Sequence, residues 1–233
     1  TILGTSRGPQ DPRTTVDFLE QQGINILFCI GGDGTQRGAH AIATEVGRRG
    51  AKISIIGIPK TIDNDIKYCF RTFGFFTAVA EAEKVIDRAH VEARSVQGGV
   101  GLVKLMGREA GYIAAAATLA SGEANFCIIP EAPIELDGPD GFLAKLEKRL
   151  AAREHAVIVI AEGAGQQWFP PNQQVDASGN PRLGDSGELL RDRINAHFAA
   201  RQLPISVKYF DPSYYIRSLP ATAVDSLLCD RFA

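Results

Sequence analysis

Residues 25–35 of the chain are Asn-Ile-Leu-Phe-Cys-Ile-Gly-Gly-Asp-Gly-Thr. An apolar run bounded by paired glycines is typical of a buried strand that ends in a tight turn. The polar-faced segment 36–49 follows with helical character, and a second apolar run occupies 53–58. A strand, a turn, a helix and another strand form a βαβ unit. This stretch therefore predicts a mostly parallel sheet covered by helices.

The same alternation continues along the chain. Val79, Ala82, Ile86 and Ala89 form an apolar stripe at helical spacing. We expect helices over 76–93, 109–120, 142–149 and 189–201, and strands over 100–105, 126–129 and 156–161. The segment 166–185 is rich in Pro, Gly and Asn, which predicts an exposed loop. The predicted class is α/β, with two Rossmann-like subdomains whose mostly parallel sheets are flanked by helices.

Composition excludes several functions for the chain. Its 25 basic and 27 acidic residues give a net charge of −2, so no positive field attracts nucleic acid or an anionic membrane. The longest apolar runs are far shorter than the roughly 18 residues that a membrane span needs. The four cysteines lack metal-ligand spacing and predict reduced, mostly buried thiols of a cytoplasmic protein. They are Cys29, Cys69, Cys127 and Cys229.

The turn Gly31-Gly32-Asp33-Gly34-Thr35 is a candidate anion site. Its backbone N–H groups and the start of the following helix face the same space, and glycines allow close approach. A carboxylate beside phosphate is favourable only with a cation between them, so Asp33 predicts bound Mg²⁺. The alternative is a structural turn shaped by the Asp33 side chain.

A second polar loop, Pro59-Lys60-Thr61-Ile62-Asp63-Asn64-Asp65, follows the other apolar run. Its ammonium, hydroxyl and two carboxylates suit phosphoryl transfer, in which one Asp accepts the proton of an attacking hydroxyl. Polar residues at the carboxyl ends of parallel strands also mark where such sheets bind ligands. An ordinary Asp-rich and Asn-rich turn is the alternative.

A third segment, Met106-Gly107-Arg108 followed by Ala110-Gly111, completes a set that resembles the phosphofructokinase family. The resemblance extends over essentially the whole chain, through 160–165 to 211–217, and is nearest the long, plant- and kinetoplastid-like branch. It implies a phosphofructokinase-like fold and transfer of the ATP γ-phosphoryl group to the 1-hydroxyl of fructose 6-phosphate, with Mg²⁺. It also implies an allosterically regulated cytoplasmic homo-oligomer, a dimer or tetramer.

The resemblance assigns roles residue by residue. Asp63 is the expected catalytic base, supported by Thr61 and by Asp65, which would lie near the metal with Asp33. The remaining expected contacts with the transferred group or the sugar phosphate are Met106, Gly107, Arg108, Glu162, Lys208, Tyr214 and Arg217. Singly, each has a plainer interpretation: Met106 suits a core, Glu162 a strand-end carboxylate, and Arg108 or Lys208 a surface charge.

The phosphoryl donor depends on two positions. In the family, pyrophosphate-dependent members carry Asp at the place of Gly34 and Lys at that of Lys60, whereas bacterial and animal ATP enzymes carry Gly at both. The chain combines Gly34 with Lys60. A carboxylate at 34 would repel and crowd the nucleotide's inner phosphate, so Gly34 favours ATP. The expected donor-binding residues are Arg7, Gly32, Gly34, Thr35 and Lys60.

The expected subdomains are a nucleotide-binding part, 1–75 with 217–233 returning to it, and a sugar-phosphate-binding part, 76–216. The resemblance implies that the family fold extends beyond both ends of this sequence. Gly99 stands where shorter bacterial enzymes place an arginine that contacts a neighbouring subunit's sugar phosphate, which leaves that contact to another residue such as Lys104. Three alternatives remain open: a pyrophosphate-dependent phosphotransferase, a non-catalytic sugar-phosphate-binding homologue, and a diacylglycerol- or NAD-kinase-like protein.

Overall fold

The structure is a computed structural model that describes residues 10–171, 174 and 181–232. The chain divides into two compact units. The first takes Thr1–Thr61, Ile66–Thr72 and Pro171–Arg182, and the second takes Ile62–Asp65, Phe73–Pro170 and Leu183–Ala233. Both contain parallel strands and helices, which confirms the α/β class predicted from the sequence.

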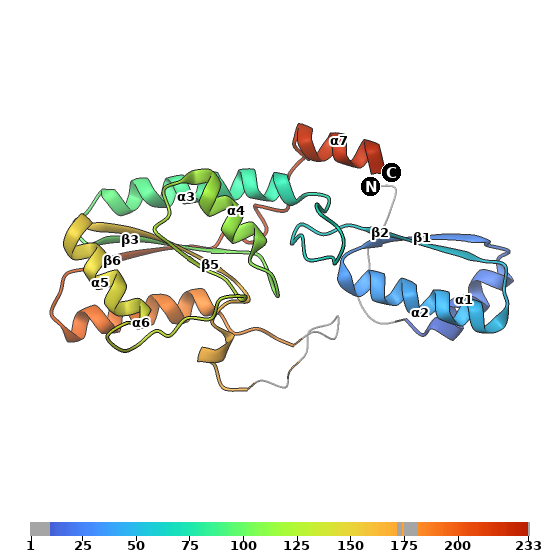
Figure 1. Ribbon diagram of the computed structural model, residues 1–233, viewed down its shortest axis with the longest axis horizontal. Helices are drawn as coiled ribbons and strands as arrows, with labels where there is room; N and C mark the ends of the chain where they lie inside the picture. Colours follow the sequence, from blue (N-terminus) through green and yellow to red (C-terminus); the bar gives the residue numbers. More distant parts are fainter. Residues whose placement is uncertain (1–9, 172–173, 175–180, 233) are drawn as a thin grey trace. The chain divides into compact units, whose positions relative to one another are not determined.

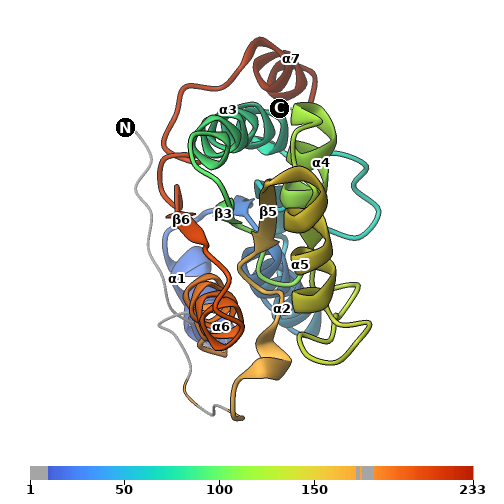
Figure 2. The ribbon, with the colours of Figure 1, turned by 90° about the vertical axis from the view of Figure 1, so that its left-hand side faces the viewer.

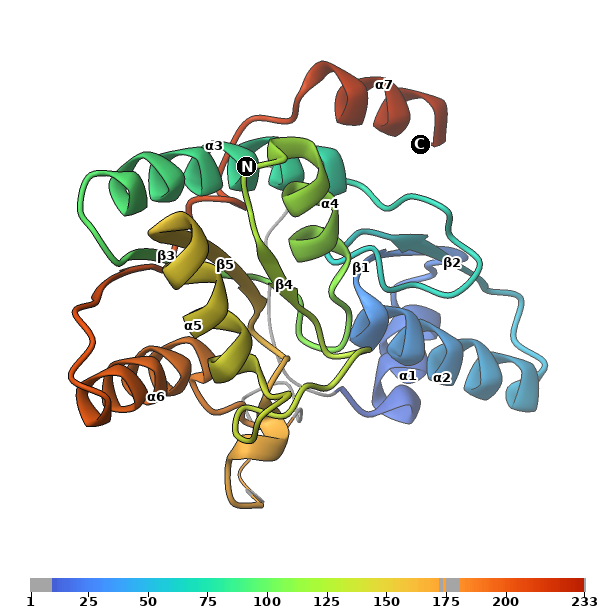
Figure 3. The same ribbon diagram turned by 60° about the vertical axis from the view of Figure 1, so that its left-hand side comes forward.

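The first unit is a βαβ element preceded by one helix. Its elements are α1 (Pro12–Gln21), β1 (Ile26–Gly31), α2 (Asp33–Arg49) and β2 (Ser54–Pro59). The two strands are parallel, with Ile26 opposite Ser54 and Gly31 opposite Pro59, so their carboxyl ends lie at the same edge. Both helices lie on one side of the strands (Figure 1; Figure 3).

The other side of this small sheet is exposed. Ile26, Phe28 and Ile30 are 46–56% exposed, whereas Leu27 and Cys29 between them are partly covered. Successive side chains of a strand point to opposite faces, so the helices of the unit cover only every second residue. The prediction of a fully buried strand is therefore wrong for β1, because only one face of the strand is covered within the described residues.

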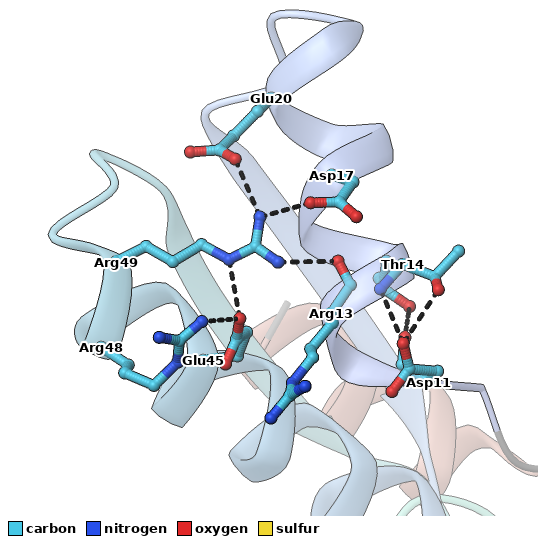
Figure 4. Close-up of polar contacts among 9 residues, drawn as sticks. Asp11, Arg13, Thr14, Asp17, Glu20, Glu45, Arg48 and Arg49 are labelled. Atoms are coloured by element: carbon cyan, nitrogen blue, oxygen red, sulfur yellow. Dashed lines mark hydrogen bonds and ion pairs between the residues drawn. The ribbon is translucent and has the colours of Figure 1, made fainter.

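An ion-pair network joins α1 to α2 (Figure 4). The Arg49 guanidinium donates to Glu45 on its own helix at 2.7 Å and to Asp17 and Glu20 on α1 at 2.5 and 3.1 Å. It also donates to the Arg13 carbonyl at 3.0 Å. Hydrogen bonds from Arg48 and Arg49 lower the pKa of Glu45 to about 2. One arginine therefore fixes the packing of the two helices in this unit.

The second unit is a four-stranded parallel sheet in the order β4-β5-β3-β6. Its strands are β3 (Gly99–Leu105), β4 (Phe126–Ile128), β5 (His155–Ala161) and β6 (Ser206–Phe210). Its helices are α3 (Phe75–Arg94), α4 (Tyr112–Ser121), α5 (Phe142–Arg153), the short η1 (Gln166–Trp168), α6 (Ser186–Ala200) and α7 (Ala223–Phe232). Helices α3 and α4 cover one face of the sheet, and α5 and α6 cover the other (Figure 1; Figure 2).

The core of this unit lies around β3 and β5. Six of the seven residues of β3 are buried, Lys104 being the exception, and residues 156–161 of β5 are buried as well. A side chain at Gly101 would place its Cβ 2.7 Å from the Ala89 carbonyl oxygen of α3. Glycine there lets the helix pack closely on the sheet. The central strands are thus covered on both faces, as parallel sheets require.

The C-terminal helix belongs to this unit. Asp225 of α7 is fully buried and accepts hydrogen bonds from the Gly74 and Thr77 amides at the start of α3, at 3.1 and 2.7 Å. The sequence-based division placed 217–233 with 1–75, whereas the contacts of this buried carboxylate place α7 with α3. Which ligand each unit binds stays a prediction.

The predicted strands and helices of the βαβ pattern are confirmed, with shifts of a few residues at their ends. Helix α2 begins at Asp33, so the Gly-rich turn is shorter than expected and runs directly into the helix. Four elements of the described residues were not predicted: α1, β6, α7 and the short η1, which lies where the sequence predicts a loop. Asp11 followed by Pro12 is a helix-start pattern that could have revealed α1, because Asp11 caps the helix through the Thr14 amide.

The four cysteines are unpaired, as predicted. The expectation that they are mostly buried is wrong: Cys127 is exposed and the other three are partly exposed. None belongs to the buried core around β3 and β5; Cys29, for instance, lies on the thinly covered β1. No helix in the described part of the chain has the length and apolar character needed to cross a membrane.

Candidate functional site

In the first unit, the candidate anion-binding turn joins the end of β1 to the start of α2. Gly32 is the N-cap residue and Asp33 is the first helical residue. The Lys60 amide donates to the Gly31 carbonyl at 2.8 Å, which ties the two predicted loops together directly after their strands. The first amides of a helix have no partner within the helix and carry the positive end of its dipole. A turn of this kind favours an anion, and anion binding at this one stays a prediction.

Gln36 fixes this edge, a role that the sequence analysis missed. Its Nε2 donates to the Gly31 and Ile58 carbonyls, at 3.0 Å each, and so joins the ends of β1 and β2. A Cβ at Gly57 would lie 2.2 Å from Gln36 Oε1, so Gly57 makes room for this side chain. A polar residue one turn into a helix that follows a strand is the signal that could have indicated it.

The predicted donor-binding residues of this unit are mostly exposed. Gly34, Thr35 and Lys60 are exposed, as is the predicted metal ligand Asp33, and Gly34 has open space where a Cβ would stand. A Cβ on Gly32 would lie 3.6 Å from the Thr61 Cβ, so the two loops are in close contact there. Arg7 lies outside the described residues.

Asp33 has the properties of a magnesium ligand. Its side chain is 49% exposed and pairs with Arg37 at 2.5 Å. Mg²⁺ takes one or two carboxylates and completes its shell with water and phosphate oxygens, so a single accessible carboxylate at an anion-binding turn fits it. Among the described residues no group of three or more His, Cys, Asp or Glu side chains is placed to hold a metal ion. Asp65 as a second ligand stays a prediction.

In the second unit, two loops leave the sheet side by side where β3 and β5 end. Leu105 and Ala161 are in register, and the Glu162 amide donates to the Leu105 carbonyl at 2.8 Å. The Gly163 amide donates to the Gly107 carbonyl at 3.0 Å. These backbone bonds place Arg108 and Glu162, two of the predicted site residues, at the same edge of the sheet.

Two glycines permit this contact. A Cβ at Gly163 would lie 1.7 Å from the Arg108 carbonyl oxygen, so no other residue fits without moving the backbone. Gly107 has a φ of +132°, a conformation that residues with side chains rarely adopt. The prediction singled out Gly107 through the family resemblance and missed Gly163. Met106 packs against the core, in agreement with its plainer interpretation.

Asp63 is the centre of the charged groups in this unit. Its side chain is partly buried, and this burial, together with the Asp65 and Glu162 carboxylates, raises the pKa of Asp63 to about 6. Arg217 and Arg108 act in the opposite direction. We call these five residues the Asp63 group. Its members come from four separate segments of the chain: the 59–65 loop, the ends of β3 and β5, and the segment after β6.

The segment after β6 presents Tyr214 and Arg217. The Arg217 guanidinium lies 4.4 Å from the centre of the Tyr214 ring, a cation–π contact. Ile216 between them is fully buried and fixes the segment to the core. The side chains of these two predicted phosphate ligands are therefore exposed at a position set by a buried neighbour.

Lys208 is not part of the Asp63 group. It lies within β6 opposite Gly101, and its Nζ is 4.0 Å from the Glu92 carboxylate of α3. Arg88 and Arg191 line the same hollow, so Lys208 belongs to a mixed-charge surface between α3 and α6. Its role as a sugar-phosphate ligand stays a prediction.

Comparisons with known proteins identify the family of the chain. A family model for phosphofructokinase matches residues 1–233. The ATP-dependent 6-phosphofructokinases of Borreliella burgdorferi and Trypanosoma brucei brucei are each 50% identical to the chain, over 99% and 100% of its length. These matches cover 53% and 48% of the two relatives, so the chain spans about half their length.

The fold also resembles solved structures. The structure of a Pichia pastoris phosphofructokinase superposes with a TM-score of 0.73 at 22% identity, covering 98% of this chain and 24% of that one. At that identity the likeness supports the fold alone. With the family model spanning every residue and two relatives sharing half of their matched positions, the chain belongs to the phosphofructokinase family.

Proposed function

We propose that the protein to which this chain belongs transfers the γ-phosphoryl group of MgATP to the 1-hydroxyl of fructose 6-phosphate. The observation that carries this proposal is the convergence of Asp63 with two further carboxylates and two guanidinium groups in the segments that follow β3, β5 and β6 and in the 59–65 loop. A carboxylate among cations is the arrangement that proton removal and phosphate binding need together. The names of the relatives at 50% identity support the same reaction.

In the proposed reaction Asp63 accepts the proton of the sugar 1-hydroxyl. The oxygen forms a bond to the γ-phosphorus, and the bond from that phosphorus to the β-phosphate oxygen breaks, which gives fructose 1,6-bisphosphate and ADP. Arg108, held beside Glu162 by the backbone bonds between their loops, offsets negative charge on the transferred group. Glu162 accepts a hydrogen bond from a sugar hydroxyl, and Tyr214 and Arg217 bind the 6-phosphate.

Asp33 would hold Mg²⁺, which when bound neutralises charge on the donor phosphates. Lys60 and the amides at the start of α2 would bind those phosphates directly. ATP is the proposed donor, because Gly34 leaves open space where a larger residue would stand. Homo-oligomeric assembly and a cytoplasmic location are further parts of the proposal that rest on the family resemblance.

The test is the Asp63→Asn variant of the full-length protein, assayed for phosphorylation of fructose 6-phosphate with ATP. We expect kcat to fall by about three orders of magnitude or more with a sugar KM near that of the wild type, because a base acts in the transition state. Asp140→Asn, at an exposed position, is the matched control and should retain activity. Near-normal turnover of Asp63→Asn would refute the role of Asp63.

Two other outcomes separate the alternatives. Turnover with pyrophosphate in place of ATP would reverse the assignment of the donor. Calorimetric binding of fructose 6-phosphate by a wild-type protein that turns over neither donor would favour the non-catalytic sugar-phosphate-binding homologue.

A further inference from the structure

Lys104 is the only residue of β3 that is not buried, yet its side chain is just 13% exposed. Its Nζ lies 2.8 Å from Asp185 Oδ2 and 2.9 Å from Asp211 Oδ2. Burial opposes the charge of this ammonium, but the two carboxylates outweigh it and raise the pKa of Lys104. One cation is thus bound by two carboxylates from different segments of the chain.

Both carboxylates also shape the backbone around them. Asp185 Oδ1 accepts the Glu188 amide at 3.0 Å and so caps the start of α6, and it accepts the Tyr209 hydroxyl at 3.3 Å. Asp211 Oδ1 accepts the amide of Ser213 at 3.2 Å and its hydroxyl. We call Lys104, Asp185, Tyr209 and Asp211 the Lys104 cluster.

Asp211 is joined through a short turn to the proposed phosphate ligands. The Asp211–Ser213 bonds close a turn in which Ser213 has a φ of +23°. Tyr214 follows directly, and its carbonyl accepts the Arg217 amide at 3.3 Å. The position of Arg217 is therefore tied through Tyr214 and this turn to Asp211, six residues before it, a carboxylate that Lys104 binds.

The segment around Asp185 is hydrogen-bonded to the loop that contains Glu162. Ser186, next to Asp185, donates through its hydroxyl to the Glu162 carbonyl at 3.3 Å. Gln166 donates to the carbonyls of Glu162 and Gly184, both at 3.1 Å. The segment 184–186 is thus joined to the loop that carries the Glu162 side chain.

We propose that Lys104 is a positioning residue for the sugar phosphate, because its ammonium joins the turn before Tyr214 and Arg217 to the segment beside Glu162. This inference rests on the proposed function. It differs from the expectation that Lys104 reaches a neighbouring subunit's sugar phosphate, since its Nζ is engaged by two carboxylates of its own chain. Replacing the ammonium with an apolar side chain leaves Asp185 and Asp211 facing each other with no cation between them, and their repulsion displaces the turn.

The test compares Lys104→Met, Asp211→Asn and the double variant in the full-length protein, with ATP and fructose 6-phosphate varied separately. We expect Lys104→Met to raise the KM for fructose 6-phosphate by about tenfold or more, while the KM for ATP stays within about twofold. The double variant should recover part of this loss, because one of the two opposed carboxylates is then neutral. Lys148→Met, an exposed lysine of α5, is the matched control.

The outcomes separate the positioning role of Lys104 from the proposed function. An active wild type with an unchanged sugar KM in Lys104→Met overturns the positioning role alone, as does an equal rise of both KM values. A wild type that neither turns over nor binds fructose 6-phosphate by calorimetry overturns the proposed function and this inference together. If Lys104→Met does not fold, Asp211→Asn by itself should raise the sugar KM several-fold, and an unchanged value overturns the role.

Discussion

Asp225 accepts hydrogen bonds from both the amide and the hydroxyl of Thr77, at 2.7 and 2.6 Å, across 148 residues of sequence. Thr77 lies in the first turn of α3, where backbone amides have no partner within the helix. A side chain of α7 therefore does for α3 what an N-cap residue normally does from the adjacent position. The start of α3 is the point where the chain leaves the loops that carry Asp63.

Replacement of this carboxylate should destabilise the second unit. Asp225→Ala removes the carboxylate that accepts from the Gly74 amide and from the amide and hydroxyl of Thr77. We expect the free energy of unfolding to fall by about 2–4 kcal/mol, measured by urea denaturation. Asp230→Ala, at an exposed position of the same helix, should change it by less than about 0.5 kcal/mol. Equal effects of the two variants would mean that the buried bonds contribute nothing.

The pH dependence of activity should follow Asp63. A base must be deprotonated to act, so kcat/KM should fall about tenfold per unit below the pKa of about 6. Glu162→Gln removes a carboxylate that raises this pKa and should shift the acid limb to lower pH. The substrate ionises in the same way in assays of the wild type and of Glu162→Gln, so it does not contribute to the difference between their pH profiles. A shift to higher pH in Glu162→Gln would contradict the assignment.

The close contact between the loops at Gly163 should not tolerate a methyl group. Gly163→Ala places a Cβ against the Arg108 carbonyl oxygen, so the backbone that presents Arg108 must move. We expect a loss of kcat/KM of roughly a hundredfold, since displacement of a catalytic group by about 1 Å has such an effect.

Gly47→Ala is the matched control for this glycine substitution. Gly47 lies in the interior of α2 with nothing near its missing Cβ. Alanine there should stabilise the protein by up to about 1 kcal/mol and leave kcat/KM unchanged. Similar activity losses in the two variants would rule out a specific role for the Gly163 contact.

The donor preference should respond to charge at position 34. Gly34 has open space around its missing Cβ, so Gly34→Asp should fold normally. Its carboxylate should lower kcat/KM for ATP by about a hundredfold or more, since its negative charge would lie a few ångströms from the donor phosphates proposed to bind at this turn. Gly34→Asn has the same shape without the charge, and a smaller loss in this variant would separate repulsion from crowding. Identical losses would assign the whole effect to size.

The sequence predicts the central part of the fold well, because strands such as 100–105 and 156–161 are apolar throughout and are bounded by clear turns. It fails for β6, where Ser206, Lys208 and a half-exposed environment conceal an edge strand. It also misses α7, whose attachment depends on Asp225, a residue typical of surfaces. A contact between one buried polar side chain and a distant segment produces no periodic pattern in the sequence.

The candidate site likewise contains residues that the sequence could reveal and residues that it could not. Asp63 could be named because it occurs in a recognisable polar loop at the end of a strand, and Glu162 could be named through the family resemblance. Gln36 and Gly163 could not, because their roles consist of contacts with the backbone of a second segment. Lys104 could be named from the sequence, but its contacts could not be predicted, because both of its partners lie more than 80 positions away.

The charge balance of the Lys104 cluster constrains how this region can evolve. One ammonium lies between two carboxylates, so loss of the positive charge at 104 alone leaves two negative charges in a confined space with no cation between them. A substitution that removes this charge should therefore be inherited together with a substitution at 185 or 211. Among relatives, an uncharged residue in place of Lys104 should be accompanied by an uncharged residue at one or both of the aspartate positions.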